Sequence, residues 1–166
     1  MFTVFKLIKK LLHYLNANEK IENITLSISF SIFYSLIPFN PLFHPILFFL
    51  VIILNGNILF FLFLTPIFLK ITILMYPLLH VLGNSILQLT YLDGVFQFLY
   101  NTPFFNYLNW NNTVSLGGYV VIIICSLPIY KAIYRLIKVY RESFLPEFKK
   151  SKISKLFKLP TWLGGQ

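Results

Sequence analysis

The chain has 166 residues, of which 57% are hydrophobic and only 11% are charged, and its mean hydropathy is +0.75. A soluble domain keeps about a quarter of its residues charged, so the composition argues against a soluble enzyme or a disordered regulator. The net charge is +9, yet between Asn23 and Tyr130 only Lys70 and Asp93 carry a charge. This distribution predicts an all-α integral membrane protein with two basic ends.

The first predicted element, residues 1–20, is a basic amphipathic helix that lies in the membrane interface. Lys6, Lys9 and Lys10 share one face because they are three and four residues apart, and apolar residues occupy the other face. No small-x-small cleavage site follows the first apolar run, which argues against a secretory signal peptide. The alternative is a cytosolic helix packed on the protein itself.

Two short apolar segments open the predicted membrane domain, residues 21–130. Segments 24–37 and 42–54 are both shorter than the ~20 residues that a ~30 Å hydrocarbon core requires. Two prolines lie between them, and neither proline can continue a helix. We therefore expect a re-entrant helical pair, with two tilted spans as the alternative. The predicted turn of this pair comprises Pro38, Asn40, Pro41 and His44.

Segment 58–79 is long enough to span the membrane, and it carries Lys70 near its middle. An ionisable group at that depth costs at least ~2.5 kcal/mol and is a candidate functional residue. Its candidate partners are Asp93, which would complete an intramembrane charge pair, or an anionic lipid. The alternative is that Lys70 extends its side chain to the membrane boundary.

Residues 81–112 follow as a predicted interfacial helix and a polar-aromatic loop, with His80 at the start of this region, and segment 113–130 is the last predicted span. Two neighbouring glycines near the start of this span permit close approach of another helix. An asparagine or threonine before them can cap the helix, and ligand contact by the exposed asparagines is the alternative. The predicted capping and packing residues are Asn111, Asn112, Thr113, Gly117 and Gly118.

The tail, residues 131–166, is strongly basic, and we expect it to contact anionic headgroups of the inner leaflet. The predicted lipid contacts of the tail are Lys149, Lys150, Lys152, Lys155 and Lys158. By the positive-inside rule both termini are cytoplasmic, which requires an even number of crossings. Two full spans plus the re-entrant pair satisfy this condition, as do four spans, and we favour the former.

Three stretches resemble one family of membrane proteins. They are Leu36-Ile-Pro-Phe-Asn-Pro-Leu42, Leu79-His-Val-Leu-Gly-Asn-Ser-Ile-Leu87 and Asn106-Tyr-Leu-Asn-Trp-Asn-Asn-Thr-Val-Ser-Leu-Gly117. Together they are similar to the bacterial proteins grouped with the domain of unknown function 2062, in a branch found in outer-membrane-bearing bacteria such as spirochaetes. The resemblance implies a multi-pass protein of the bacterial inner membrane whose partner is a larger envelope protein.

Motifs for catalysis and for metal binding are absent from the sequence, which has no paired carboxylates, phosphate-binding loop or metal-ligand spacing. We expect no enzymatic activity, no cofactor and no nucleic-acid partner. The predicted function is that of an accessory or anchor subunit of a cell-envelope complex. The alternative is a small channel or transporter component that uses Lys70.

Overall fold

The computed structural model describes residues 19–144, and within this range the chain is helical without a β-strand. The predicted N-terminal helix with Lys6, Lys9 and Lys10 lies outside the described residues, as do the five predicted lipid-contacting lysines of the tail. A short 3₁₀-helix, Thr90–Leu92, lies between α5 and α6, and a π-helical segment, Tyr140–Phe144, follows α8. The helices are α2 (Ile21–Leu36), α3 (Phe43–Ile53), α4 (Ile58–Ile73), α5 (Tyr76–Leu87), α6 (Asp93–Asn101), α7 (Pro103–Asn106) and α8 (Thr113–Val139).

One helix in the described range is long and apolar enough to cross a membrane, namely α8 continued into the π-helical segment, Thr113–Ser143. It is longer than the predicted span 113–130, because the helix continues past Pro128 into the basic region. The pair α4 and α5 reaches the required length only if both helices belong to one bent span, and α3 is apolar but short.

The predicted segment 58–79 is not one continuous helix, because α4 ends at Ile73 and α5 begins at Tyr76 at an angle of 70° to it. Pro77 favours a break at this position. It has no N–H to donate to the Ile73 carbonyl, and its ring would collide with that carbonyl in a continuous helix. As a result α5 includes His80, which was expected at the start of the interfacial region.

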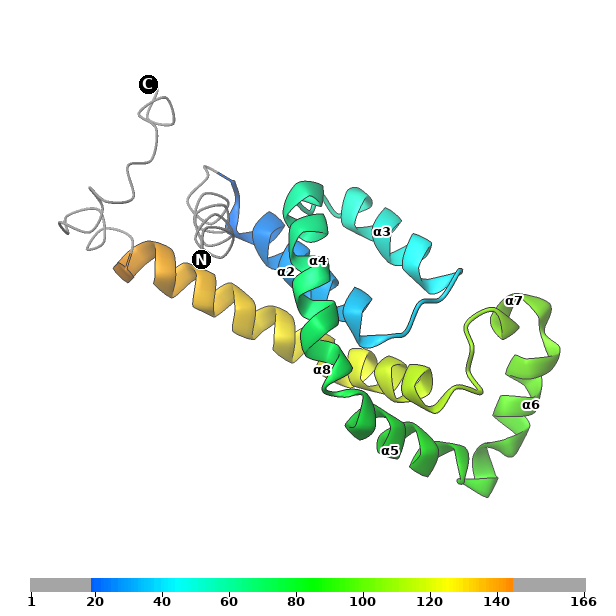
Figure 1. Cartoon of the computed structure of the whole chain (residues 1–166). Helices are drawn as coiled ribbons and strands as arrows, with labels where there is room; N and C mark the ends of the chain where they lie inside the picture. The colour runs from blue at the N-terminus through cyan, green and yellow to red at the C-terminus, as the bar shows by residue number, and fades with distance from the viewer. Residues whose placement is uncertain (1–18, 145–166) are drawn as a thin grey trace.

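Helices α2 and α4 run parallel to each other and antiparallel to α8. The Ser27 hydroxyl donates a hydrogen bond to the Asn57 carbonyl oxygen. Two turns further on, the Ser35 hydroxyl donates one to the Thr65 carbonyl oxygen, so both helices advance in the same direction. Near its start α2 shares a core cluster with Ile137, late in α8, whereas its end contacts Gly118. Helix α3 returns the chain from the end of α2 to the start of α4 (Figure 1).

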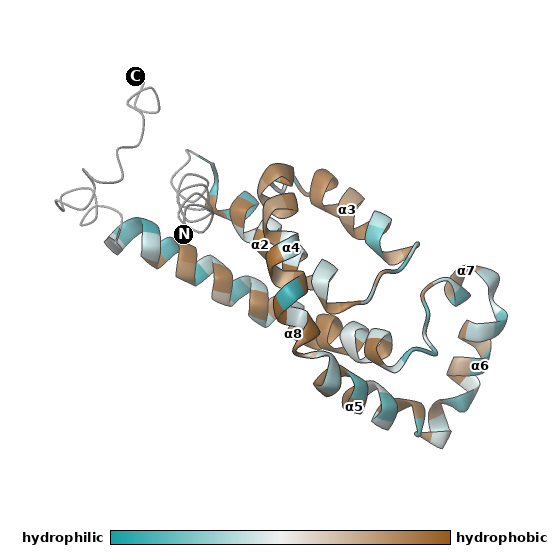
Figure 2. Cartoon of the chain, viewed as in Figure 1, coloured by the Kyte–Doolittle hydropathy of each residue, from teal (hydrophilic) through white to brown (hydrophobic). Residues whose placement is uncertain are grey.

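The apolar core has two centres along this bundle. One contains Ile24, Phe60, Leu64 and Ile137, where α2, α4 and the end of α8 meet. The other contains Phe33, Leu36, Leu47 and Leu79, from α2, α3 and α5. Figure 2 shows apolar residues concentrated on α3, α4 and the middle of α8, and more polar residues on α6, α7 and the last turns of α8. Helices α6 and α7 lie at the end of the molecule opposite to residues 19 and 144 (Figure 1).

Candidate functional site

The contact between α5 and α8 depends on glycine. A Cβ atom at Gly83 would overlap the Thr113 carbonyl oxygen, and one at Gly117 would overlap the Leu79 carbonyl oxygen. Gly118 faces the end of α2, where an added Cβ would lie 2.9 Å from the Ile37 side chain. The two glycines singled out in the sequence therefore face two different helices, and Gly83 completes the contact from the α5 side.

Asn112 caps α8, since its Oδ1 accepts a hydrogen bond from the Ser115 N–H at 3.0 Å. The neighbouring Thr113 serves a different purpose: its Oγ1 lies 2.6 Å from His80 Nδ1 and joins α8 to α5. Asn111 is exposed and lines a cavity described below. The three residues of this short stretch thus contribute a cap, an interhelical hydrogen bond and a cavity wall.

The turn between α2 and α3 is secured by Asn40 and His44, both of which are buried. Asn40 Oδ1 accepts hydrogen bonds from the N–H groups of Leu42 and Phe43, at 3.0 and 2.8 Å. His44 Nδ1 lies 3.0 Å from the Asn40 backbone nitrogen, and Nε2 lies 3.1 Å from the Tyr34 carbonyl oxygen. These contacts satisfy backbone groups that an apolar environment would otherwise leave unpaired, so both side chains stabilise the turn.

Lys70 and Asp93 are not joined in an ion pair within residues 19–144, and both side chains are exposed. Lys70 also lies nearer a helix end than the sequence suggested, because α4 ends only three residues later. A cation in the last turn of a helix is favoured by the partial negative charge of the free carbonyls there. The geometry therefore supplies Lys70 with a favourable site that does not require Asp93.

A polar cluster lies at the end of the bundle where α2 and α4 begin and α8 ends, and it was not predicted. Asn57 caps α4 through Oδ1, which accepts from the Phe60 N–H at 2.8 Å, and its Nδ2 donates to Glu19 Oε1 at 2.6 Å. Arg141 donates from Nη1 to the Glu19 carbonyl oxygen at 2.7 Å. This cluster connects the starts of α2 and α4 to the residues that follow α8. Glu19, the side-chain partner of Asn57, lies 38 residues away along the chain, so neighbouring residues alone could not indicate this cluster.

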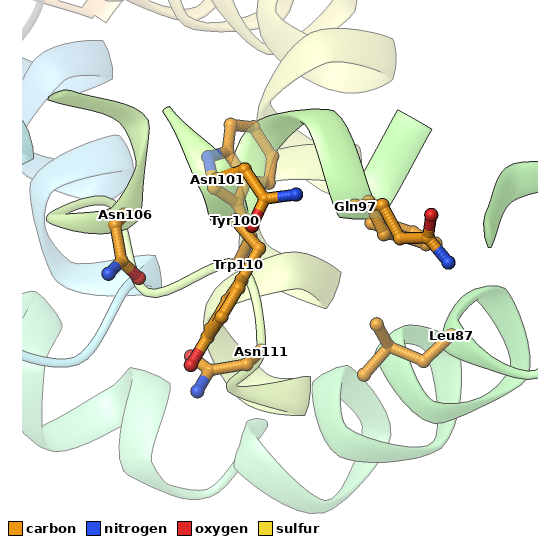
Figure 3. A pocket seen from close by; sticks show the side chains of 8 residues that line it. Leu87, Gln97, Tyr100, Asn101, Asn106, Trp110 and Asn111 are labelled. Atoms are coloured by element: carbon orange, nitrogen blue, oxygen red, sulfur yellow. The ribbon is translucent and has the colours of Figure 1, made fainter. Parts of the chain in front are cut away.

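A cavity of about 280 Å³ lies where α5 and α6 approach the segment before α8. Its walls include the side-chain amides of Gln97, Asn101, Asn106 and Asn111. They also include the rings of Phe96, Tyr100 and Trp110, together with Leu87. Figure 3 shows Asn106, Trp110 and Asn111 on one side of this space and Leu87 and Gln97 on the other. None of the lining residues that the structure describes is charged. The asparagine-rich composition of residues 101–112 was the signal in the sequence, although it did not indicate α6 as the opposite wall.

In comparisons with known proteins, no family model matches the chain, and no curated protein or solved structure matches it. The likeness to the domain of unknown function 2062 therefore stays a prediction. In the described range no group of three or more His, Cys, Asp or Glu side chains is placed to hold a metal ion.

Proposed function

We propose that this chain is a non-enzymatic inner-membrane protein that anchors or assists a larger cell-envelope complex. The observation that carries the proposal is the uncovered apolar surface of α8. Ile123, Ile124 and Leu127 are 73%, 67% and 69% exposed, whereas a core helix of a soluble protein buries such residues. A contiguous apolar surface of this kind requires lipid or another protein to cover it.

The lengths of α2 and α3 support a re-entrant pair over two further crossings. At 1.5 Å per residue, the 16 residues of α2 and the 11 of α3 extend about 24 Å and about 17 Å, both less than the ~30 Å hydrocarbon core. The polar cluster of Glu19, Asn57 and Arg141 marks one end of the bundle. With this end on the basic, cytoplasmic side, α2 and α3 enter and leave from the cytoplasm, and α6 and α7 lie on the outer side.

The test is co-purification from the native host in a mild detergent, using a tagged full-length chain. A stoichiometric envelope protein should accompany the wild-type chain and a Gly94→Ala chain, because Gly94 has no neighbour within 4 Å of an added Cβ. Less of it should accompany a Gly117→Ala chain, in which the added Cβ overlaps the Leu79 carbonyl oxygen and displaces α5 from α8. If no protein accompanies the wild-type chain, the proposal fails.

A second candidate function, a small channel or transporter component, is favoured by one observation. The bend between α4 and α5 begins three residues after Lys70, and broken helices are typical of transporter binding sites. This function predicts ion or solute flux in liposomes that contain the purified chain alone, and a lower flux for Lys70→Met. Clear flux without any co-purifying protein would place this candidate first.

A further inference from the structure

The cavity between α5, α6 and residues 106–111 combines two kinds of wall that suit one class of ligand. Each of its four amide side chains offers both a donor and an acceptor, and a hydroxyl group also donates and accepts. Its aromatic rings offer flat apolar faces, which match the C–H face of a sugar ring. A charged ligand would lose its hydration without gaining an opposite charge from the lining, so the cavity selects for uncharged groups.

One ring of the aromatic wall, that of Trp110, is held in place by the core. The Trp110 ring packs on the buried Tyr119 ring with 4.8 Å between centroids, and the Tyr119 hydroxyl donates to the Leu108 carbonyl oxygen at 2.9 Å. On its other side Tyr119 meets Phe43 at 5.3 Å. An aromatic ring that is fixed before binding lowers the entropy cost of association.

We infer that this cavity binds an uncharged polyhydroxylated ring, either a free neutral saccharide or the sugar headgroup of a glycolipid. Its volume of about 280 Å³ is close to the ~300 Å³ lower limit of typical small-molecule pockets, which fits one or two rings. Exposed apolar side chains lie on α6 and α7, among them Phe98 and Phe104. They would place the cavity at headgroup level, where a glycolipid presents its sugar.

The test uses the fluorescence of Trp110 in the full chain. The chain has two tryptophans, so Trp162, which lies outside the described residues, is replaced by Phe. The protein is placed in nanodiscs of phosphatidylethanolamine and phosphatidylglycerol. One series adds increasing monoglucosyldiacylglycerol to the discs, a second adds the same diacylglycerol without sugar, and a third adds free glucose to the buffer.

A saturable change of Trp110 emission with the glycolipid or with glucose is expected, and the series that produces it identifies the source of the sugar. Tyr100→Ala should raise the half-saturating concentration about tenfold, through the loss of one aromatic face. Tyr107→Ala is the matched control, because Tyr100 and Tyr107 are both 63% exposed and only Tyr100 lines the cavity.

Three outcomes would overturn the inference. The first is the absence of a saturable change of Trp110 emission in both sugar series. The second is an equally large emission change with the sugar-free diacylglycerol. The third is an equal rise of the half-saturating concentration in Tyr107→Ala and Tyr100→Ala. If Tyr100→Ala does not fold, Gln97→Leu replaces it, since this exposed position exchanges an amide for an apolar group of similar size. Gln97→Leu should weaken binding of the sugar, whereas unchanged binding would count against the proposed amide contacts.

Discussion

Two helix contacts in this protein achieve close approach by different chemical means. Between α5 and α8 the helices meet where Gly83 and Gly117 have no side chain. Between α2 and α4 the small side chains remain, and hydroxyl groups reach across: Ser31 Oγ lies 3.1 Å from the Phe61 carbonyl oxygen. The same hydroxyl lies 2.7 Å from the Ser27 carbonyl oxygen of its own helix. The serine hydroxyl therefore has an alternative hydrogen-bond partner within its own helix. The glycine contact leaves no room for a side chain, because an added Cβ would overlap the backbone of the other helix.

Because of this difference, the α2–α4 contact should tolerate side-chain substitution better than the α5–α8 contact. Removal of a serine hydroxyl loses a weak interaction and leaves a small gap, so the helices can stay where they are. Addition of a methyl group to a glycine forces two backbones apart. In a membrane, where apolar side chains gain little by leaving lipid, van der Waals contact between backbones is a main source of helix association.

The largest expected effect is that of Gly117→Ala. The added methyl group would overlap the Leu79 carbonyl oxygen, so the free energy of unfolding should fall by about 1–3 kcal/mol, as for other overpacked sites. The measurement is SDS-induced unfolding of the purified protein, followed by circular dichroism. Gly94→Ala is the control and should cause no loss, because its added methyl group meets nothing within 4 Å. Equal stability of the two variants would contradict the glycine contact.

A smaller effect is expected from Asn112→Ala, which removes the cap at the start of α8 and leaves the Ser115 N–H unpaired. The loss should be about 1 kcal/mol, measured in the same unfolding experiment. Asn112→Ser, which keeps a capping oxygen, should recover most of it. Asn111→Ala should leave stability unchanged, because Asn111 is exposed and is not the cap. A loss in Asn111→Ala as large as that in Asn112→Ala would show that the cap is assigned to the wrong residue.

The smallest effect is expected from Ser31→Ala, which removes the hydroxyl between α2 and α4. In the proposed membrane setting, interhelical hydrogen bonds are worth about 0.6 kcal/mol on average, and the loss should be of that size. Ser29→Ala is a matched control on the same helix: Ser29 is also buried, but its Oγ has no hydrogen-bond partner in the described structure. That substitution should be neutral or slightly stabilising. If both variants lose the same stability, the hydroxyl bridge contributes nothing.

The candidate site was partly predictable, and the residues involved explain the limit. Asn112 and the turn at Asn40 follow from local rules for caps and prolines, which need only neighbouring residues. The cavity needs α6 to face residues 106–111, and that arrangement depends on the path of the chain after α5. The serines at positions 27, 31 and 35 repeat every four residues, a spacing typical of small-residue helix contacts. This pattern was the signal that could have predicted the α2–α4 contact.

Three features follow from the order of residues alone: the charge distribution, the helical class and the turns at the strongest helix breakers. The order of residues did not determine which proline breaks a helix. Pro66 and Pro128 lie inside the continuous helices α4 and α8, whereas Pro77 follows the bend between α4 and α5. Each of the three disfavours a helix to a similar degree, so local propensity cannot distinguish them. The tertiary structure decides which proline accompanies a break, because the bend near Pro77 is the one that allows Gly83 to contact Thr113 and Gly117 to contact Leu79.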